Sequence, residues 1–269
     1  MTFPLKPILV SAILFLSCNT GKLNVVGSID SDLDEASAAQ MVKGSNLIWT
    51  IEDAGNKNNV YGMDIKGNIV KDIDIDNVKN DDWEDLTSDK EGNLYIGDFG
   101  NNSRKRKIFY IYKIEDIANL HNKTNAKTIT FILPKDVKSE DFEAFFLWNN
   151  TFYIFSKEDD KTMVIKVPNQ IGTHTATFLT EYELKGKDTR VTSADISPNG
   201  KTIVLLNHDK VWTLTNFKSD RFFEGDVTSI DLEHDSQKEG ICFKNNSTVI
   251  ITDEDSGKED NNIYTFKLN

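Results

Sequence analysis

The sequence predicts an all-β protein, a β-propeller with five four-stranded blades, and one repeat carries this prediction. Five times along the chain an acidic residue opens a short strand, and a second strand follows that ends in a polar or charged residue. Successive openers lie 49, 59, 52 and 44 residues apart, near the length of one propeller blade, roughly 40–50 residues. Most segments alternate apolar and polar residues between Asn, Gly, Asp or Pro turns, as half-buried strands do. The openers are Glu35, Glu84, Glu143, Asp195 and Glu239.

The first two strands of a unit are clearest at residues 82–102, DWEDLTSDKEGNLYIGDFGNN. One strand follows Glu84, a turn at Gly92-Asn93 reverses the chain, and LYIGD carries the second strand to Asp98. The same pair of strands is expected at residues 35–56, 141–160, 191–209 and 237–255. The third and fourth strands are expected at VYGMDI and IVKDIDI, IFYIYKI and TITFIL, VIKV and TFLTEYEL, VWTL and VTSIDLE, and finally IYTFKL.

The last unit has only three strands, because the sequence ends soon after IYTFKL. An unassigned strand, LNVVGSI at residues 23–29, lies near the other end of the chain. If it forms the outer strand of the last blade, the ring closes without a free β-edge. We therefore expect five blades closed by the N-terminal strand, and six blades are the alternative.

The N-terminal segment predicts export and lipid anchoring. Lys6 precedes the apolar run ILVSAILFL, and Ser17-Cys18 follows it, as in a secretory signal that is too short to span a membrane stably. The FLSC ending resembles the bacterial lipoprotein box, which implies that Cys18 is lipidated and that the protein is anchored to the bacterial cell envelope. The expected organisation is a signal peptide over 1–17, a tether over 18–22 and one propeller domain over 23–269. The alternative is an ordinary signal peptide with a chance cysteine.

Composition restricts the partners. The net charge of −12 and the pI near 4.8 argue against nucleic acid and against electrostatic binding to an anionic membrane. We expect a monomer that contacts the membrane only through its lipid and that binds a small molecule or an envelope ligand. Cys242 lies in the apolar run GICF, where a cysteine is expected to pack as a small apolar residue.

The repeat predicts a metal site. The innermost strand of each blade runs along the central axis, so equivalent residues of successive blades converge at one end of the channel. Crowded carboxylates repel unless they are protonated, paired or bridged by a cation. Oxygen ligands with few His or Cys favour calcium. The predicted calcium ligands are the five openers together with Asp98 and Asp253, and the predicted ligand-binding residues are Asp53, Lys157 and Asn207.

Two groups in this set are candidates for acid–base chemistry. The Lys157 ammonium could neutralise part of the acidic ring, anchor a ligand or transfer a proton, and His208, next to Asn207, could act as a general base. The alternative for the acidic openers is a structural role, in which they bond to the backbone of the neighbouring blade without a metal.

The strings DWEDL, IGDFGNN, DFEAF, VTSADISPNGKTIV and QKEGI together resemble the secreted bacterial propellers related to phytase-like, or esterase-like, domains. The resemblance implies a calcium-dependent propeller that acts on phosphate or ester substrates. A phytate site would also need many basic residues, and Lys157, Arg104 and Arg106 are the only ones near the motifs that we expect to be able to bind phosphate. Gluconolactonase-like propellers are a second comparison, which implies a lactone substrate. A surface binding module without catalysis is the third alternative.

Overall fold

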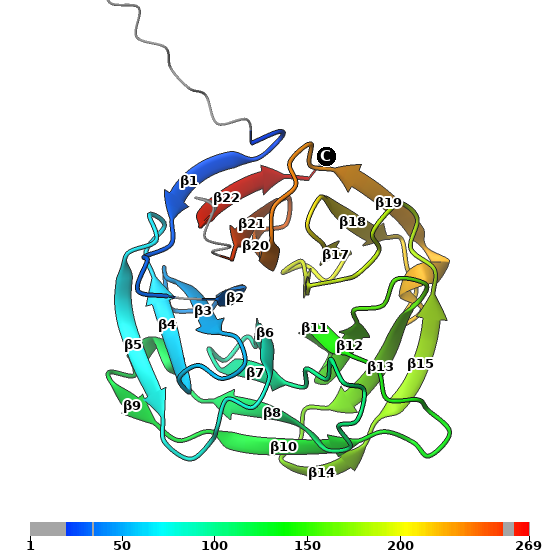
Figure 1. Ribbon diagram of the computed structural model, residues 1–269, viewed down its shortest axis with the longest axis horizontal. Helices are drawn as coiled ribbons and strands as arrows, with labels where there is room; N and C mark the ends of the chain where they lie inside the picture. Colours follow the sequence, from blue (N-terminus) through cyan, green and yellow to red (C-terminus); the bar gives the residue numbers. More distant parts are fainter. Residues whose placement is uncertain (1–19, 34, 255–260, 269) are drawn as a thin grey trace, which may run out of the picture.

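The computed structural model describes residues 20–33, 35–254 and 261–268, and these residues form five sheets around a central axis (Figure 1). The predicted all-β propeller with five blades is confirmed. In blades 1 to 4 the four main strands follow one another along the chain, from the axis to the rim. Two short 3₁₀ turns, Ile117–Asn119 and Phe222–Glu224, lie in the connections. Within the described residues no helix is long and apolar enough to cross a membrane.

The five blades have the same antiparallel core of four strands. Blade 1 contains β2 (Ala36–Met41), β3 (Ile48–Glu52), β4 (Asn59–Met63) and β5 (Ile69–Ile75). Blade 2 contains β6 (Trp83–Ser88), β7 (Leu94–Asp98), β8 (Phe109–Ile114) and β10 (Lys127–Ile132). Blade 3 contains β11 (Phe142–Trp148), β12 (Thr151–Ser156), β13 (Thr162–Pro168) and β15 (Thr177–Tyr182). Blade 4 contains β16 (Ser193–Ile196), β17 (Thr202–Leu206), β18 (Lys210–Thr215) and β19 (Asp226–Asp231).

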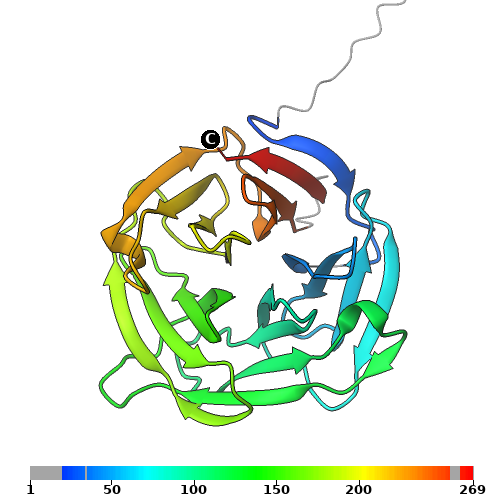
Figure 2. The same cartoon turned by 180° about the vertical axis from the view of Figure 1, so that it is seen from behind.

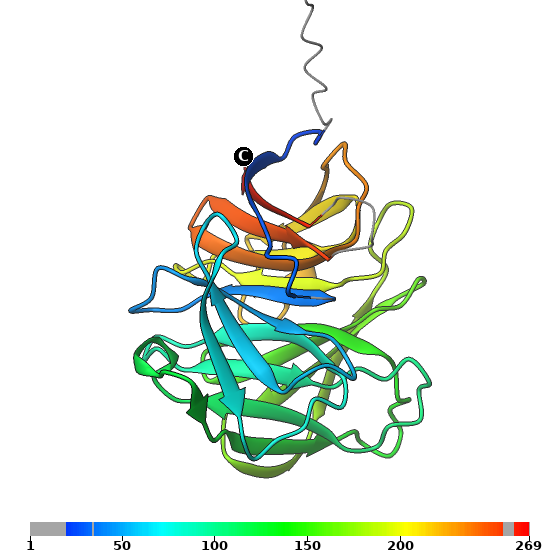
Figure 3. The same cartoon turned by 60° about the vertical axis from the view of Figure 1, so that its left-hand side comes forward.

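Blade 5 closes the ring as predicted. Its strands β20 (Lys238–Asn245), β21 (Thr248–Asp253) and β22 (Asn262–Lys267) come from the end of the chain, and its outer strand is β1 (Asn24–Ser28). Strand β1 pairs with β22 in antiparallel register, and the views from behind and from the side show the two strands next to each other at the rim (Figures 2 and 3). The first and last described strands therefore share one sheet.

Two further strands were not predicted. Strand β9 (Lys123–Thr124) pairs in parallel with β5, and β14 (Gly172–Thr175) pairs in parallel with β10, so blades 1 and 2 each have a fifth strand at the rim. Both strands are short and mostly polar, and neither has the alternation that identifies a half-buried strand. They cover two outer edges that would otherwise expose unpaired backbone groups.

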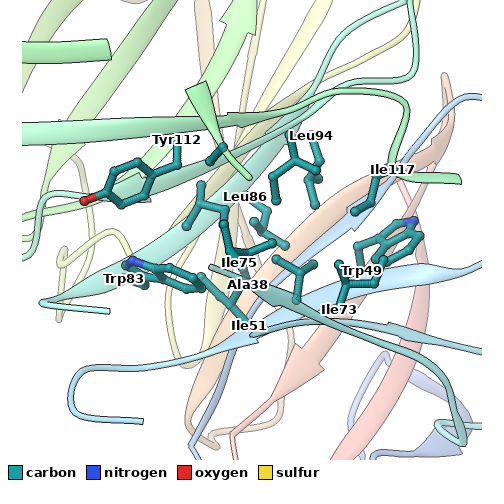
Figure 4. Close-up of a cluster of buried hydrophobic side chains, with 14 of the residues drawn as sticks. Ala38, Trp49, Ile51, Ile73, Ile75, Trp83, Leu86, Leu94, Tyr112 and Ile117 are labelled. Atoms are coloured by element: carbon teal, nitrogen blue, oxygen red, sulfur yellow. The ribbon is translucent and has the colours of Figure 1, made fainter. Parts of the chain in front are cut away.

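Five apolar clusters fill the spaces between neighbouring blades. Figure 4 shows the cluster between blades 1 and 2, where Trp49 and Trp83 pack with Ile51, Leu86 and Leu94, all of them buried. Cys242 is completely buried in the cluster between blades 5 and 1, which confirms that it packs as an apolar residue. The stability of the ring therefore rests on the surfaces between blades.

The inner strands also meet through a buried polar network at the centre of the channel. Asp85 of blade 2 accepts hydrogen bonds from the backbone amide of Phe145 in blade 3 (3.0 Å) and from the Ser193 hydroxyl in blade 4 (3.0 Å). It also accepts bonds from the amides of Leu86 (2.9 Å) and Ala194 (3.3 Å). Asp85 has no exposed surface. Its carboxylate therefore connects three blades across the axis.

Candidate metal centre at the acidic mouth

Glu84, Glu143 and Glu239 are presented to one end of the channel by the same local distortion. In blades 2, 3 and 5 the pairing between the first two strands shifts by one residue at the glutamate, so each glutamate sits on a β-bulge. A bulge leaves one residue unpaired and redirects its side chain. The three side chains are nearly buried, with 6%, 5% and 7% of their residues' surfaces exposed. The prediction that these three glutamates occupy equivalent positions is confirmed.

The three glutamates interact with one another and with two basic groups. Glu84 and Glu143 share a hydrogen bond between blades 2 and 3. The Nζ atom of Lys157 donates to Oε2 of Glu143 across 3.1 Å. The Nε2 atom of His208 lies 3.2 Å from Oε1 of Glu239. We call these residues, together with Asp53, Asp82 and Glu254, the acidic mouth.

Three carboxylates of the acidic mouth form a group with the spacing of metal ligands. One oxygen each of Asp53, Asp82 and Glu84 lies within 4.8 Å of the others, and the group combines residues of blades 1 and 2. Gly100 makes room for it, because a Cβ atom at that position would lie 1.9 Å from Oε1 of Glu84 and 2.5 Å from Cγ of Asp82. The donor set consists only of carboxylate oxygens, which suits a hard divalent cation such as calcium.

Burial and mutual repulsion raise the pKa values of the acidic mouth. Burial and the neighbouring Asp53 raise the pKa of Asp82 to about 6. Burial, followed by the hydrogen bond and charge of Glu143, raises the pKa of Glu84 well above its usual range, and burial raises the pKa of Glu143 to about 8. Burial and then Glu239 raise the pKa of Glu254 to about 7. The charged forms of these groups are therefore costly without a counter-charge.

Lys157 supplies part of that counter-charge. Burial disfavours its ammonium, but the carboxylates of Glu239, Glu143 and Glu84 outweigh this effect and raise the Lys157 pKa. One cation stands among several acids, so the acidic mouth still carries more potential negative charge than Lys157 can balance.

The predicted residues at the ends of the second strands have different surroundings. Asp98 accepts hydrogen bonds from Arg106 (2.6 Å) and from the Tyr112 hydroxyl (2.9 Å). Asp253 accepts bonds from Ser236 (2.8 Å) and from the Tyr264 hydroxyl (2.5 Å). Both carboxylates are fully buried and bonded to protein donors, which supports a structural role for them.

The tyrosine–carboxylate pair recurs in blade 1, where the acid is Glu52. The Tyr61 hydroxyl donates a hydrogen bond to Glu52 at 2.7 Å. In the strand register, Glu52 lies opposite Ala36, just as Asp98 lies opposite Trp83 in blade 2. Asp53 is the next residue after Glu52, and its side chain lies at the acidic mouth instead. Asp53 therefore lies one residue beyond the position that Asp98 occupies in blade 2.

The prediction for Asp195 is corrected. It was expected beside the other openers, but its amide-bonding pattern matches that of Thr87: Asp195 accepts from the amide of Phe243 (2.7 Å) as Thr87 accepts from the amide of Leu147 (3.1 Å). By the same alignment, Thr192 takes the place of Glu84 in blade 4. Asp195 thus lies farther along its strand, toward the other end of the channel. The carboxyl group is buried, and burial raises its pKa to about 7.

Glu35 and Asn207 lie at the periphery of the acidic mouth. Glu35 is exposed and accepts a hydrogen bond from the Asn56 amide (2.9 Å). Asn207 is buried, where its amide donates to the carbonyl oxygen of Asp188 (2.6 Å) and its side-chain oxygen accepts from the amide of Lys210 (2.9 Å). Asn207 therefore shapes the loop that presents His208.

Asp82 and Glu254 were missed by the sequence reasoning. Asp82 stands two residues before Glu84 in DWEDL, and Glu254 follows Asp253 as Asp53 follows Glu52. For Glu254 the available signal was the repeated acid pair at the ends of the second strands, Glu52-Asp53 and Asp253-Glu254.

The basic residues near the motifs are already paired. Arg104 forms ion pairs with Glu158 (2.6 Å) and Glu140 (3.3 Å), and Arg106 forms one with Asp98 (2.6 Å). A phosphate-rich substrate would have to compete with these carboxylates. The phytase-like resemblance is not supported by this arrangement.

We predict that the metal-free protein becomes less stable as pH rises from 5 to 8. Acids with raised native-state pKa values hold extra protons in the folded state, so their stabilising effect is lost as pH rises through those values. Glu84, Glu143, Glu254 and Asp82 all contribute to the expected loss, which is on the order of a few kcal/mol. Urea unfolding in EDTA at pH 5, 6.5 and 8 measures it. Glu143→Gln should make the profile less steep, and a wild-type profile that rises toward pH 8 would contradict the electrostatic account.

Comparison with known proteins identifies the fold. No protein-family model and no curated protein sequence matches the chain. The PQQ-bound aldose sugar dehydrogenase from Streptomyces coelicolor is similar in structure, with a TM-score of 0.53 and 7% identity, over 92% of this chain and 98% of that chain. A hydrazine synthase from Kuenenia stuttgartiensis has a TM-score of 0.43 and 12% identity over 84% of this chain and 57% of that chain. This similarity is too low to support a conclusion. The protein is similar to bacterial β-propellers, and at these identities the likeness concerns the fold alone.

Proposed function

We propose that the protein is a calcium-binding propeller that acts as a metal-assisted hydrolase of phosphoester, ester or lactone substrates at the acidic mouth. One observation carries the proposal: the carboxylates of Asp53, Asp82 and Glu84 converge within 4.8 Å in a partly buried site where pKa values are raised. Clustered titratable groups with raised pKa values are typical of functional sites.

These three residues would hold the cation, and Gly100 leaves the space that their carboxylates need. Bound calcium would supply positive charge that polarises a carbonyl or phosphoryl oxygen. The remaining acidic mouth provides proton-transfer groups. Glu239 orients the His208 imidazole, so His208 can accept a proton from water, while Lys157 is held by Glu143 and can stabilise a developing negative charge.

A substrate screen tests the catalytic part of the proposal. The soluble protein from residue 19 onward is assayed against p-nitrophenyl phosphate, bis-p-nitrophenyl phosphate, p-nitrophenyl acetate and gluconolactone, with calcium and with EDTA. We expect calcium-dependent turnover of one substrate class and a loss of about 10²-fold or more in His208→Ala, the range for a general base. Calcium binding without turnover of any of these substrates would contradict the hydrolase and leave a binding protein.

A non-catalytic binding module is the second candidate, and one observation favours it. The Glu84–Glu143 hydrogen bond joins two blades, and Lys157 already neutralises part of the ring. In that case the acidic mouth would hold the blades together and the loops would contact the ligand. Inactivity in the substrate screen, combined with destabilisation by Glu84→Gln, would favour this candidate.

We also infer that the propeller is anchored to the bacterial cell envelope through Cys18, which lies outside the described residues. Thioether lipidation requires the Cys18 thiol, so Cys18→Ala should abolish lipid labelling and release the protein from the membrane fraction. Fractionation after metabolic labelling with a palmitate analogue measures both. Cys242→Ala is the matched control, since that thiol is buried. Membrane retention of the Cys18→Ala protein would rule out the anchor.

A further inference from the structure

A second site lies at the opposite end of the channel. A cavity of about 650 Å³ opens where the inner strands end, and its wall takes residues from all five blades, among them Gln40, Thr87, Trp148, Asp195 and Phe243. None of the residues that define the acidic mouth lines it. The buried Asp85 network occupies the channel between the two ends. The cavity, which we call the distal cavity, is therefore a separate site.

The distal cavity is polar without being strongly charged. Its lining contains two lysines, Lys43 and Lys90, and three acids, Asp89, Glu91 and the buried Asp195, so its formal net charge is only −1, in contrast to the acidic mouth. The Asp195 carboxyl is occupied by the amides of Ile196 and Phe243. The net charge of the lining is thus small, which favours a ligand of small net charge.

Uncharged hydrogen-bonding groups are plentiful in the distal cavity. Asn149 and Asn150 form the turn between β11 and β12, both with left-handed backbone (φ 49° and 59°), and their exposed side-chain amides have no partner in the described part of the chain. Asn199 adds a further amide nitrogen, whereas the Ser88 hydroxyl is already bonded to Gln40 and Met41. Amides and hydroxyls both donate and accept, which matches the hydroxyl groups of a sugar.

Trp148 supplies an aromatic surface beside these groups. It is only partly buried, whereas Trp49, Trp83 and Trp212 have no exposed surface. A Cβ atom at Gly200 would lie 2.9 Å from its indole nitrogen, so the missing side chain leaves the indole N–H accessible, and this N–H has no acceptor among the described residues. An indole combines a large apolar face with one hydrogen-bond donor.

One buried atom adds an independent indication of a ligand. Gln40 is 6% exposed, and its Oε1 atom is buried without a hydrogen-bond partner in the described chain, although its Nε2 donates to Met41 and Ser88. A buried acceptor of this kind is costly unless water or a ligand satisfies it.

We propose that the distal cavity binds a neutral carbohydrate of one or two rings. Its volume lies within the range of small-ligand sites, about 300–1,000 Å³. The small net charge, the amides of Asn149 and Asn150 and the partly exposed indole favour an uncharged, polyhydroxylated ligand over an anion or a cation. This site is independent of the proposed hydrolase.

Tryptophan fluorescence provides the test, because Trp148 is the partly exposed tryptophan. The soluble protein is titrated with glucose, galactose, arabinose, cellobiose and maltose, and with glucuronate and glucosamine as charged counterparts, up to about 10 mM, which would nearly saturate a site with a Kd of about 1 mM. We expect a saturable change with at least one neutral sugar and weaker binding of its charged counterpart.

Two variants locate the binding by calorimetry. Trp148→Phe keeps an aromatic ring but loses the indole N–H, and Asn150→Gly removes one amide while it tolerates the left-handed backbone. Each should weaken sugar binding at least tenfold, and Glu84→Gln at the acidic mouth should leave it unchanged. The proposal is overturned if no neutral sugar binds, if a charged sugar binds more tightly, or if both cavity variants bind as the wild type does.

Discussion

Asp85→Ala is expected to be strongly destabilising, with a loss of about 4 kcal/mol of unfolding free energy. The substitution removes the acceptor for four buried donors that come from blades 2, 3 and 4. Each buried donor that is left unsatisfied costs about 1–3 kcal/mol, and the emptied space adds to the loss. Burial raises the Asp85 pKa, and the four hydrogen bonds lower it. Each donor therefore helps to stabilise the buried carboxylate, so the network depends on all of its members.

Chemical unfolding of the soluble protein measures this effect. Asp136→Ala is the matched control, because Asp136 is an exposed acid in a loop, where substitutions usually change stability by less than about 0.5 kcal/mol. Ser193→Ala should show a smaller loss of the same kind, since Ser193 both donates to Asp85 and accepts from the amide of Ile241 (3.1 Å). Equal unfolding midpoints for Asp85→Ala and Asp136→Ala would show that the blades do not depend on the central network.

Deletion of residues 23–30 should destabilise the whole domain by more than about 4 kcal/mol. Strand β1 forms the outer edge of blade 5, and its removal leaves β22 without a partner on that side. The deletion also removes Leu23 and Ile29 from the core, where only 5% and 4% of their surfaces are exposed. Burial of each side chain contributes roughly 1.5–3 kcal/mol. Edge pairing and apolar burial are thus lost together.

Differential scanning calorimetry compares the deletion with a mild change in the same strand. Val25 is 44% exposed, so Val25→Ala should leave the melting temperature nearly unchanged, whereas the deletion should lower it by tens of degrees or prevent folding. A deletion variant that melts like the wild type would show that the ring does not need β1 for closure.

The repeat length was enough to predict the fold. The openers recur near one blade length and the strands alternate, so the number of blades and the closing strand could be inferred without any tertiary information. The two parallel rim strands could not, because β9 and β14 have too few apolar residues to identify them.

The candidate site was predicted correctly only where residues that repeat in the sequence also occupy equivalent positions in the blades. Glu84, Glu143 and Glu239 share one bulge position, and their convergence was foreseen. In blade 4 the acid, Asp195, lies three residues beyond the position that corresponds to Glu84. Because blades vary in length, the spacing of acids in the sequence cannot reveal such a shift. Asp82 joins Asp53 only through the contact between blades 1 and 2, which is a property of the folded ring.

Calcium titration by calorimetry of EDTA-treated protein tests the central claim most directly. We expect a binding heat and a higher melting temperature, equivalent to about 2.7 kcal/mol of added stability at a hundredfold excess of calcium over its Kd. Glu84→Gln should weaken binding at least tenfold, whereas Asp74→Asn, an acid on the outer strand β5 whose carboxylate is 41% exposed, should not. If calcium produces neither heat nor a thermal shift, the acidic mouth is a hydrogen-bonded structural ring and not a metal centre.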